Sequence, residues 1–272
     1  MYIKIPKNRI SKIAIVKTDC KLYLSQVIAQ QKCDYAINGG LYDMKSGEVN
    51  PIPLRIDGKT IANSSDGYWV LAWNDGPDIS MVHSKDMGKY KNAIACATML
   101  KDGQNTIFTY TSAQGGVRGR TGFGDDHDNV HLFVSTDNNG PISPTSLRST
   151  MKQNGAQNAI MLDCGGSSQL YYNGKYLQGE KRKVAYWVCI WTVKDTSCPY
   201  PEPTRTLKKG CVGEDVKWLQ YKLNLAIDAK LPVTDSFWTL TEDAVKDFQK
   251  KNYLVVDGIA GTKTIAKLKE VV

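Results

Sequence analysis

A short proline-rich segment divides the chain into two stretches with different sequence patterns. Residues 195–204 contain Pro199, Pro201 and Pro203, each separated from the next by a single residue. Because proline fixes φ and lacks a backbone N–H, alternating prolines hold a chain extended as a semi-rigid spacer. We therefore expect two domains, at residues 1–194 and 205–272, joined by a linker at residues 195–204.

The composition is that of a folded protein. Of the 272 residues, 42% are hydrophobic and 23% are charged, close to the average of globular domains. Apolar runs such as residues 184–188 are much shorter than the roughly 18 residues that span a bilayer, so we expect no membrane insertion. Lysines interrupt the apolar stretches near the N-terminus before a signal-peptide core can form. We expect synthesis in the cytoplasm without an export signal.

The formal net charge of +8 favours polyanionic partners through long-range attraction. No arginine stripe or zinc-finger spacing points to nucleic acid, which leaves anionic lipid and the phosphate-rich walls of Gram-positive bacteria. The seven cysteines include no C-x-x-C pair, and the three histidines have no metal-binding spacing. We expect no metal or other cofactor, and the oligomeric state is left open.

The stretch before the linker has the pattern of β-strands. Runs rich in Ile, Val, Tyr and Trp are interrupted by turn dipeptides such as Asp57-Gly58, Asn139-Gly140 and Asn173-Gly174. Helical patterns occur only at residues 22–31 and 146–154. We predict an α+β fold whose first domain is built on a large mixed sheet.

The stretch after the linker has the pattern of three short helices, at residues 214–227, 241–251 and 262–271. It contains the elements G-x-x-G, V-x-x-L-Q-x-x-L-N, A-V-x-x-F-Q and V-D-G-x-x-G-x-x-T, which begin at residues 210, 216, 244 and 256. These elements resemble the family of three-helix peptidoglycan-binding domains. The resemblance implies wall carbohydrate as a partner and makes Gln220, Gln249 and Asp257 candidates for binding it. The alternative is that these side chains only satisfy local backbone groups.

Two motifs in the first stretch place small polar residues after a hydrophobic strand. One is Asn38-Gly39-Gly40, and the other is the run Asp163-Cys164-Gly165-Gly166-Ser167-Ser168. Backbone without side chains can approach a ligand closely and donate N–H groups to an anion or a sugar. We predict that both motifs contribute to substrate binding.

These motifs, with Arg120-Thr121-Gly122, Phe133–Asp137 and Arg182–Ala185 in the same order along the chain, resemble the phosphodiester glycosidase family. The resemblance covers roughly residues 10–193. It implies a glycosidase whose substrate contains a sugar phosphodiester or a related glycan bond. This chain has Cys164 where the family usually has glycine, and Asp137-Asn138 where the family usually has Asp-Gly.

Glycoside hydrolysis commonly needs one carboxyl group that protonates the leaving oxygen and another that acts as base or nucleophile. The candidate catalytic acids are Asp163, Glu48 and Asp137, and Asp163 is preferred because a carboxyl group at the end of a buried strand can have a raised pKa. Each also has a simpler interpretation, since acids in turns commonly accept local N–H bonds or face solvent.

The arginines Arg120 and Arg182 are predicted to bind a phosphate or a carboxylate, because a guanidinium binds either with two hydrogen bonds. An ordinary salt bridge is the alternative for each. Ser167 and Ser168 are predicted to contact phosphate oxygens or sugar hydroxyls, or else to shape the turn.

Together these features predict a cell-wall glycoside hydrolase of the endolysin type, held on the wall by its second domain and released with phage lysis machinery. One alternative is a wall-binding or receptor protein with an inert cleft. Another is a serine hydrolase that uses Ser167, although the G-x-S-x-G pattern is incomplete and no histidine is clearly positioned to serve it.

Overall fold

The computed structural model describes residues 1–65, 67–106, 115–178, 182–193 and 198–272. The chain divides into two compact units, Met1–Val193 and Lys194–Val272, each of which is described separately. Residues 195–197 of the predicted linker lie outside the described residues. None of the helices among the described residues has both the length and the apolar character needed to cross a bilayer.

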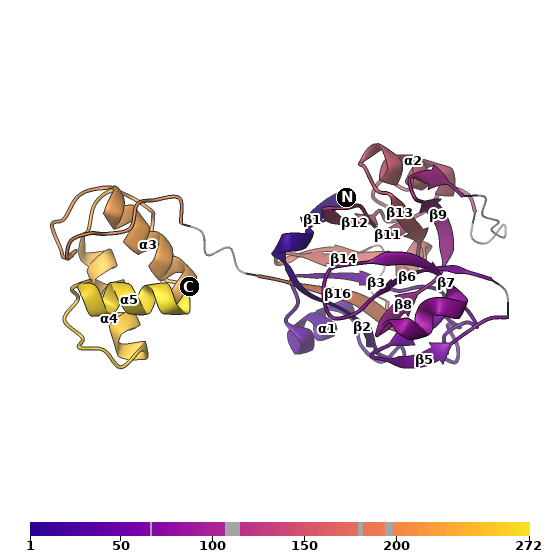
Figure 1. Ribbon diagram of the computed structural model, residues 1–272, viewed down its shortest axis with the longest axis horizontal. Coiled ribbons are helices and arrows are strands. Elements are labelled where there is room, and N and C mark those ends of the chain that lie inside the picture. The colour runs from indigo at the N-terminus through magenta and orange to yellow at the C-terminus, as the bar shows by residue number, and fades with distance from the viewer. Residues whose placement is uncertain (66, 107–114, 179–181, 194–197) are drawn as a thin grey trace. The chain divides into compact units, whose positions relative to one another are not determined.

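The described strands of unit 1 form three sheets (Figure 1). The first sheet has the order β1 (Tyr2–Pro6), β12 (Asn129–Val134), β11 (Thr121–Asp125), β13 (Asn158–Met161), β9 (Ala97–Lys101) and β10 (Gln104–Asn105). The second has the order β15 (Lys175–Gln178), β14 (Gln169–Tyr172), β3 (Tyr35–Asn38), β16 (Tyr186–Thr192) and β2 (Ile10–Lys17). The third has the order β5 (Lys59–Ala62), β4 (Leu54–Ile56), β8 (Asn92–Ile94), β6 (Trp69–Trp73) and β7 (Ser80–His83).

Two α-helices accompany these sheets in the described part of unit 1: α1 (Leu24–Gln31) and α2 (Pro144–Gln153). The α2 helix begins after Ser143, whose Oγ accepts a hydrogen bond from Ser146 N (3.0 Å), and it packs on β9, β11, β12 and β13 (Figure 1). Single 3-10 turns form at η1 (Lys7–Arg9), η2 (Ser84–Lys89) and η3 (Gly165–Ser167). The predicted α+β class is confirmed.

The expected mixture of parallel and antiparallel pairs is not found, because every pair among the described strands of unit 1 is antiparallel. Parallel pairing needs long crossovers that are usually helical, and two helices offer few of them. One hydrophobic core joins the three sheets and includes Phe123, Trp187 and Trp73. The buried Trp73 Nε1 donates to Ile13 O (2.9 Å), which connects the third sheet to the second.

Unit 2 contains the three predicted helices, α3 (Glu214–Ile227), α4 (Thr239–Lys251) and α5 (Thr262–Val271) (Figure 1). They enclose a separate core that includes Leu219, Phe237 and Phe248. Isolated antiparallel bridges, Leu207 with Ala260 and Val212 with Ser236, hold the connecting segments against the helices.

Candidate functional site

A pocket of about 380 Å³ opens where elements of all three sheets meet in unit 1. Its lining residues end or follow β13, precede β11, or adjoin β6, β8 and β9. Leu41 after β3 and Ile52 before β4 complete the lining. The polar or reactive members of the lining are Tyr68, Cys96, Arg118, Arg120, Asp163 and Cys164. The pocket therefore contains one of the predicted carboxyl groups and one of the two predicted arginines.

Asp163 lies two residues after the end of β13, next to the buried Leu162. Burial raises the pKa of its carboxyl group, while hydrogen bonding from Ser167, the Cys164 N–H (2.9 Å to Oδ1) and the charge of Arg182 act in the opposite direction. The net effect is a raised pKa. Such a carboxyl group can keep a proton at higher pH than an ordinary aspartic acid and still be stabilised after it loses the proton.

Ser167 links Asp163 to Tyr42. Its buried hydroxyl lowers the pKa of both side chains, and Tyr42 Oη donates to Lys183 O (3.2 Å). Burial raises the pKa of Tyr42, so its phenol stays protonated over a wide pH range. Ser167 is therefore placed to orient the Asp163 carboxyl group.

The two predicted arginines have different surroundings. Arg120 is fully buried and donates to three main-chain carbonyls: Ile142 O (3.1 Å), Gly115 O (2.9 Å) and Gly116 O (2.7 Å). It therefore fixes the neighbouring loops as well as lining the pocket. Arg182 is half-buried, and its charge lowers the pKa of Asp163. Arg118 also lines the pocket. It was not predicted, although it lies only two residues before the predicted Arg120.

The Asn38-Gly39-Gly40 motif is used for packing. A β-carbon on Gly39 would lie 2.3 Å from the ring of the buried Tyr186, and one on Gly40 would lie 2.6 Å from its hydroxyl oxygen. The buried Asn38 side chain accepts from Thr121 Oγ1 (2.8 Å) and donates to Asp163 O (2.9 Å). The motif thus positions the backbone that carries Asp163.

The glycine–serine turn after Asp163 is anchored by backbone hydrogen bonds. Gly165 has a φ of +64°, a conformation that favours glycine, and its N–H donates to Gly119 O (2.9 Å). Gly166 lies between it and Ser167 within η3. The buried Ser168 Oγ has no hydrogen-bond partner among the described residues.

The other two predicted acids are exposed. Asp137 Oδ1 accepts from Gly119 N (2.6 Å), and its Oδ2 lies 3.8 Å from the position of a β-carbon on Gly165, so the carboxylate borders the Asp163 turn. Glu48 lies in the turn closed by the Tyr42–Val49 bridge and does not line the pocket.

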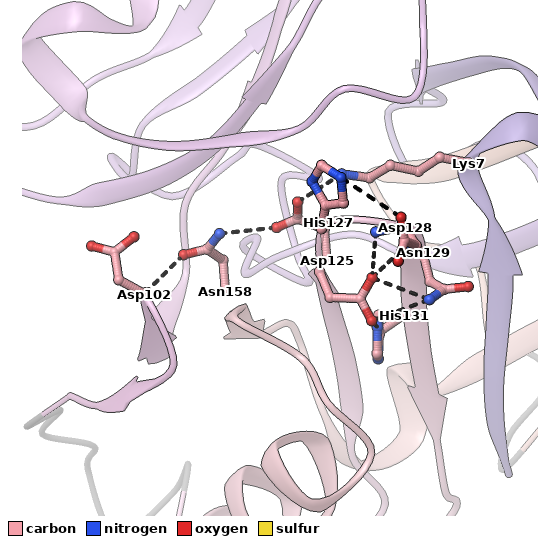
Figure 2. Close-up of polar contacts among 9 residues, drawn as sticks. Lys7, Asp102, Asp125, His127, Asp128, Asn129, His131 and Asn158 are labelled. Carbon is pink, nitrogen blue, oxygen red and sulfur yellow. Dashed lines mark hydrogen bonds and ion pairs between the residues drawn. The ribbon is translucent and has the colours of Figure 1, made fainter.

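None of the three histidines forms a hydrogen bond with Ser167 among the described residues. His131 is buried in a polar cluster near the β11–β12 turn (Figure 2). Its Nδ1 lies 2.6 Å from Tyr2 Oη, and its Nε2 lies 2.7 Å from Asp126 Oδ2. His127 is exposed in that turn, and His83 ends β7. None of the three lines the pocket, so the serine-hydrolase interpretation lacks its base.

Besides Asp163 in the pocket, the polar cluster around His131 contains another carboxyl group whose pKa is raised, that of Asp125. Asp125 forms an ion pair with Lys7 (3.1 Å) and accepts from Asn158 Nδ2 (3.1 Å) (Figure 2). Burial raises its pKa, and the contacts with Lys7 and Asn158 oppose that effect. The described residues contain no group of three or more His, Cys, Asp or Glu side chains arranged to hold a metal ion.

The predicted binding residues of unit 2 make internal hydrogen bonds. Gln220 is buried, donates to Ser236 O and Thr241 Oγ1, and accepts from Thr234 N. Gln249 is buried, and its Nε2 donates to Asp257 Oδ1 (2.8 Å). Of the three predicted binding residues, Asp257 is the exposed one. Gln249 and Asp257 also border a pocket of about 310 Å³ between α4 and α5.

Comparison with known proteins identifies both units. The phosphodiester glycosidase family matches residues 31–191, more than half of the chain, and the chain belongs to this family. Residues 212–268 match a second family, described as "Putative peptidoglycan binding domain". A search of curated proteins finds no match.

Two solved structures share the fold of unit 1, and a third is similar in sequence over a short part of the chain. The zebrafish N-acetylglucosamine-1-phosphodiester alpha-N-acetylglucosaminidase catalytic domain, auto-inhibited by its pro-peptide, has a TM-score of 0.55 and 17% identity over 66% of this chain and 73% of that chain. A hypothetical protein from Synechocystis has a TM-score of 0.52 and 12% identity over 71% of this chain and 59% of its own. A Burkholderia AP3 phage endolysin is 44% identical over 24% of each chain, with a TM-score of 0.23.

Proposed function

We propose that this protein is a hydrolase of the bacterial cell wall that cleaves a glycosidic or glycosyl-phosphate bond in peptidoglycan or in a polymer attached to it. The proposal rests on a pocket carboxyl group and a wall-binding-family unit that occur in the same chain. A half-buried carboxyl group with a raised pKa, Asp163, lines a pocket of a phosphodiester glycosidase unit, and the same chain contains a peptidoglycan-binding-family unit.

The surroundings of Asp163 fit a group that gives and takes a proton. Its raised pKa favours the protonated form that a leaving oxygen requires, and Ser167 and the Cys164 N–H stabilise the carboxylate left behind. Asp137, which borders the same turn, is our candidate for the second carboxyl group, ahead of Glu48, which lies in the turn closed by Tyr42 and Val49. Arg118 and Arg182 add positive charge that suits a phosphate or carboxylate on the substrate.

Unit 2 serves as the anchor in this proposal. Tethering a catalytic unit to its polymer raises the local concentration of bonds that it can attack. The protein then works at the cell wall, in an endolysin-type role in which phage lysis machinery gives it access.

The test is incubation of the full chain with purified Gram-positive walls, followed by mass spectrometry of the soluble products. New reducing sugars identify a cut within the glycan, and sugars released with phosphate identify a glycosyl-phosphate bond. Asp125→Asn is the matched control for Asp163→Asn, because Asp125 is also a buried carboxyl group with a raised pKa but lies at the far end of β11. Absence of any product from the folded full chain would leave only a wall-binding protein.

A further inference from the structure

A second pocket, of about 470 Å³, lies along the edge of the third sheet beside β7 and η2. Three ring side chains line it: Trp69 at the start of β6, His83 at the end of β7, and Tyr90 after η2. The ring centroids of Trp69 and His83 are 5.8 Å apart at an angle of 79°, and 38% of the Trp69 side chain remains exposed. The pocket thus presents an aromatic surface to solvent.

This aromatic surface carries positive charge. Lys101 Nζ lies 4.5 Å from the centroid of the Trp69 ring, and Lys85 and Lys89 line the pocket. Lys89 is paired with Asp86 (2.8 Å) and Lys101 with Asp102, whereas Lys85 has no ion pair with any described residue. An unneutralised ammonium group beside an exposed indole fits a ligand that has both an apolar ring face and a negative charge.

The second pocket is linked to the pocket of Asp163 through the chain segment that begins β6. Tyr68 lines the Asp163 pocket and the next residue, Trp69, lines the second one. Tyr68 is held in place by its carbonyl, which accepts from Ser84 N (2.8 Å) at the start of η2. The two pockets are therefore lined by successive residues of one chain segment.

We propose that the pocket of Trp69, His83 and Tyr90 is an accessory subsite for an anionic sugar polymer, in which a pyranose ring stacks on Trp69 and a neighbouring carboxylate or phosphate pairs with Lys85. This inference rests on the proposed function, because the subsite would hold the polymer chain on which Asp163 acts. Pyranose rings have C–H faces that pack on aromatic rings, and the exposed indole supplies such a face.

The test uses the full chain labelled with 5-fluorotryptophan and read by fluorine NMR. The sequence has six tryptophans, and the Trp69 resonance is the one missing from a Trp69→Phe variant. Two anionic probes distinguish the sources of the charge: a soluble tetrasaccharide of alternating N-acetylglucosamine and N-acetylmuramic acid, and a soluble sugar-substituted glycerol-phosphate polymer. A neutral N-acetylglucosamine tetrasaccharide is the control ligand.

We expect a saturable shift of the Trp69 resonance with at least one anionic probe. The probe that causes the shift identifies whether the subsite binds a carboxylate or a phosphate. Lys85→Glu should weaken this binding by about fivefold, the upper range for an exposed charge pair. A matched variant, Tyr176→Ala, removes another exposed aromatic side chain that lines neither pocket and should not change the shift.

A Trp69 resonance that stays unchanged with both anionic probes at millimolar concentration overturns the subsite. Equal affinity for the neutral probe, with no effect of Lys85→Glu, overturns the role of charge. Because the readout does not need turnover, an inactive chain could still give the Trp69 response. An active chain with an unresponsive Trp69 would keep the proposed function and lose this subsite.

Discussion

At the scale of single residues, Asp163 is held between opposing influences. Burial disfavours its charged form, while Ser167, the Cys164 N–H and Arg182 favour that form, and burial has the larger effect. A proton-transferring acid needs both forms to be accessible, which is what the surroundings of Asp163 provide.

The raised pKa gives Asp163→Asn a stability signature. The fold favours the protonated form, so the contribution of Asp163 to stability is present below its ordinary pKa of 3.8 and is lost as the pH rises through the raised value. Asn stays neutral throughout. We expect the variant to melt at or above the temperature of the parent at pH 7, with the difference vanishing near pH 3 in scanning calorimetry. A melting temperature clearly below that of the parent at pH 7 would mean that the carboxylate stabilises the fold.

At the scale of elements, the site depends on how the ends of β3, β13 and β16 pack. Gly39 follows β3 and contacts the ring of Tyr186, the first residue of β16, and Gly39 O accepts from Asp163 N (3.1 Å) after β13. A change at Gly39 therefore acts on the backbone that positions the candidate acid.

Gly39→Ala should destabilise unit 1 by about 1–3 kcal/mol, the usual cost of forcing extra volume into a packed core. The new β-carbon would lie 2.3 Å from the Tyr186 ring, which is buried and cannot move aside freely. Gly76→Ala is the control, because no atom lies within 4 Å of its β-carbon position. Urea denaturation of both variants measures the difference, and equal stabilities would show that Tyr186 does not need the glycine.

The sequence predicted elements better than it predicted the site. The helices at 214–227 and 262–271 have the predicted bounds because their apolar periodicity is a local property. Asn38 was predicted to bind substrate, yet its side chain bonds to Thr121 and Asp163, more than 80 positions away. Tyr68 and Cys96 were not predicted, because only the assembly of three sheets brings them to the pocket.

At the scale of the whole molecule, the chain combines two units with separate cores. The core of unit 1 joins its three sheets, and the core of unit 2 joins its three helices. Each unit matches a different family. Under the proposed function, hydrolysis and wall binding therefore belong to different units and can be tested separately.

Residues 198–272 expressed alone should fold and sediment with purified peptidoglycan, because they contain the complete helical core. Residues 1–193 alone should melt cooperatively but remain in the supernatant. Sedimentation at low salt, with fractions compared on gels, measures both. If the helical fragment stays in solution while the full chain sediments, wall binding belongs elsewhere in the molecule.

The central claim is that Asp163 takes part in cutting a wall polymer. Its most direct test is the rate at which the full chain and Asp163→Asn release soluble sugar from purified Gram-positive walls under identical conditions. We predict that the full chain releases sugar and that the folded variant does so about a hundredfold or more slowly, because its side chain can no longer transfer a proton. Near-equal release by the two folded proteins would contradict the claim.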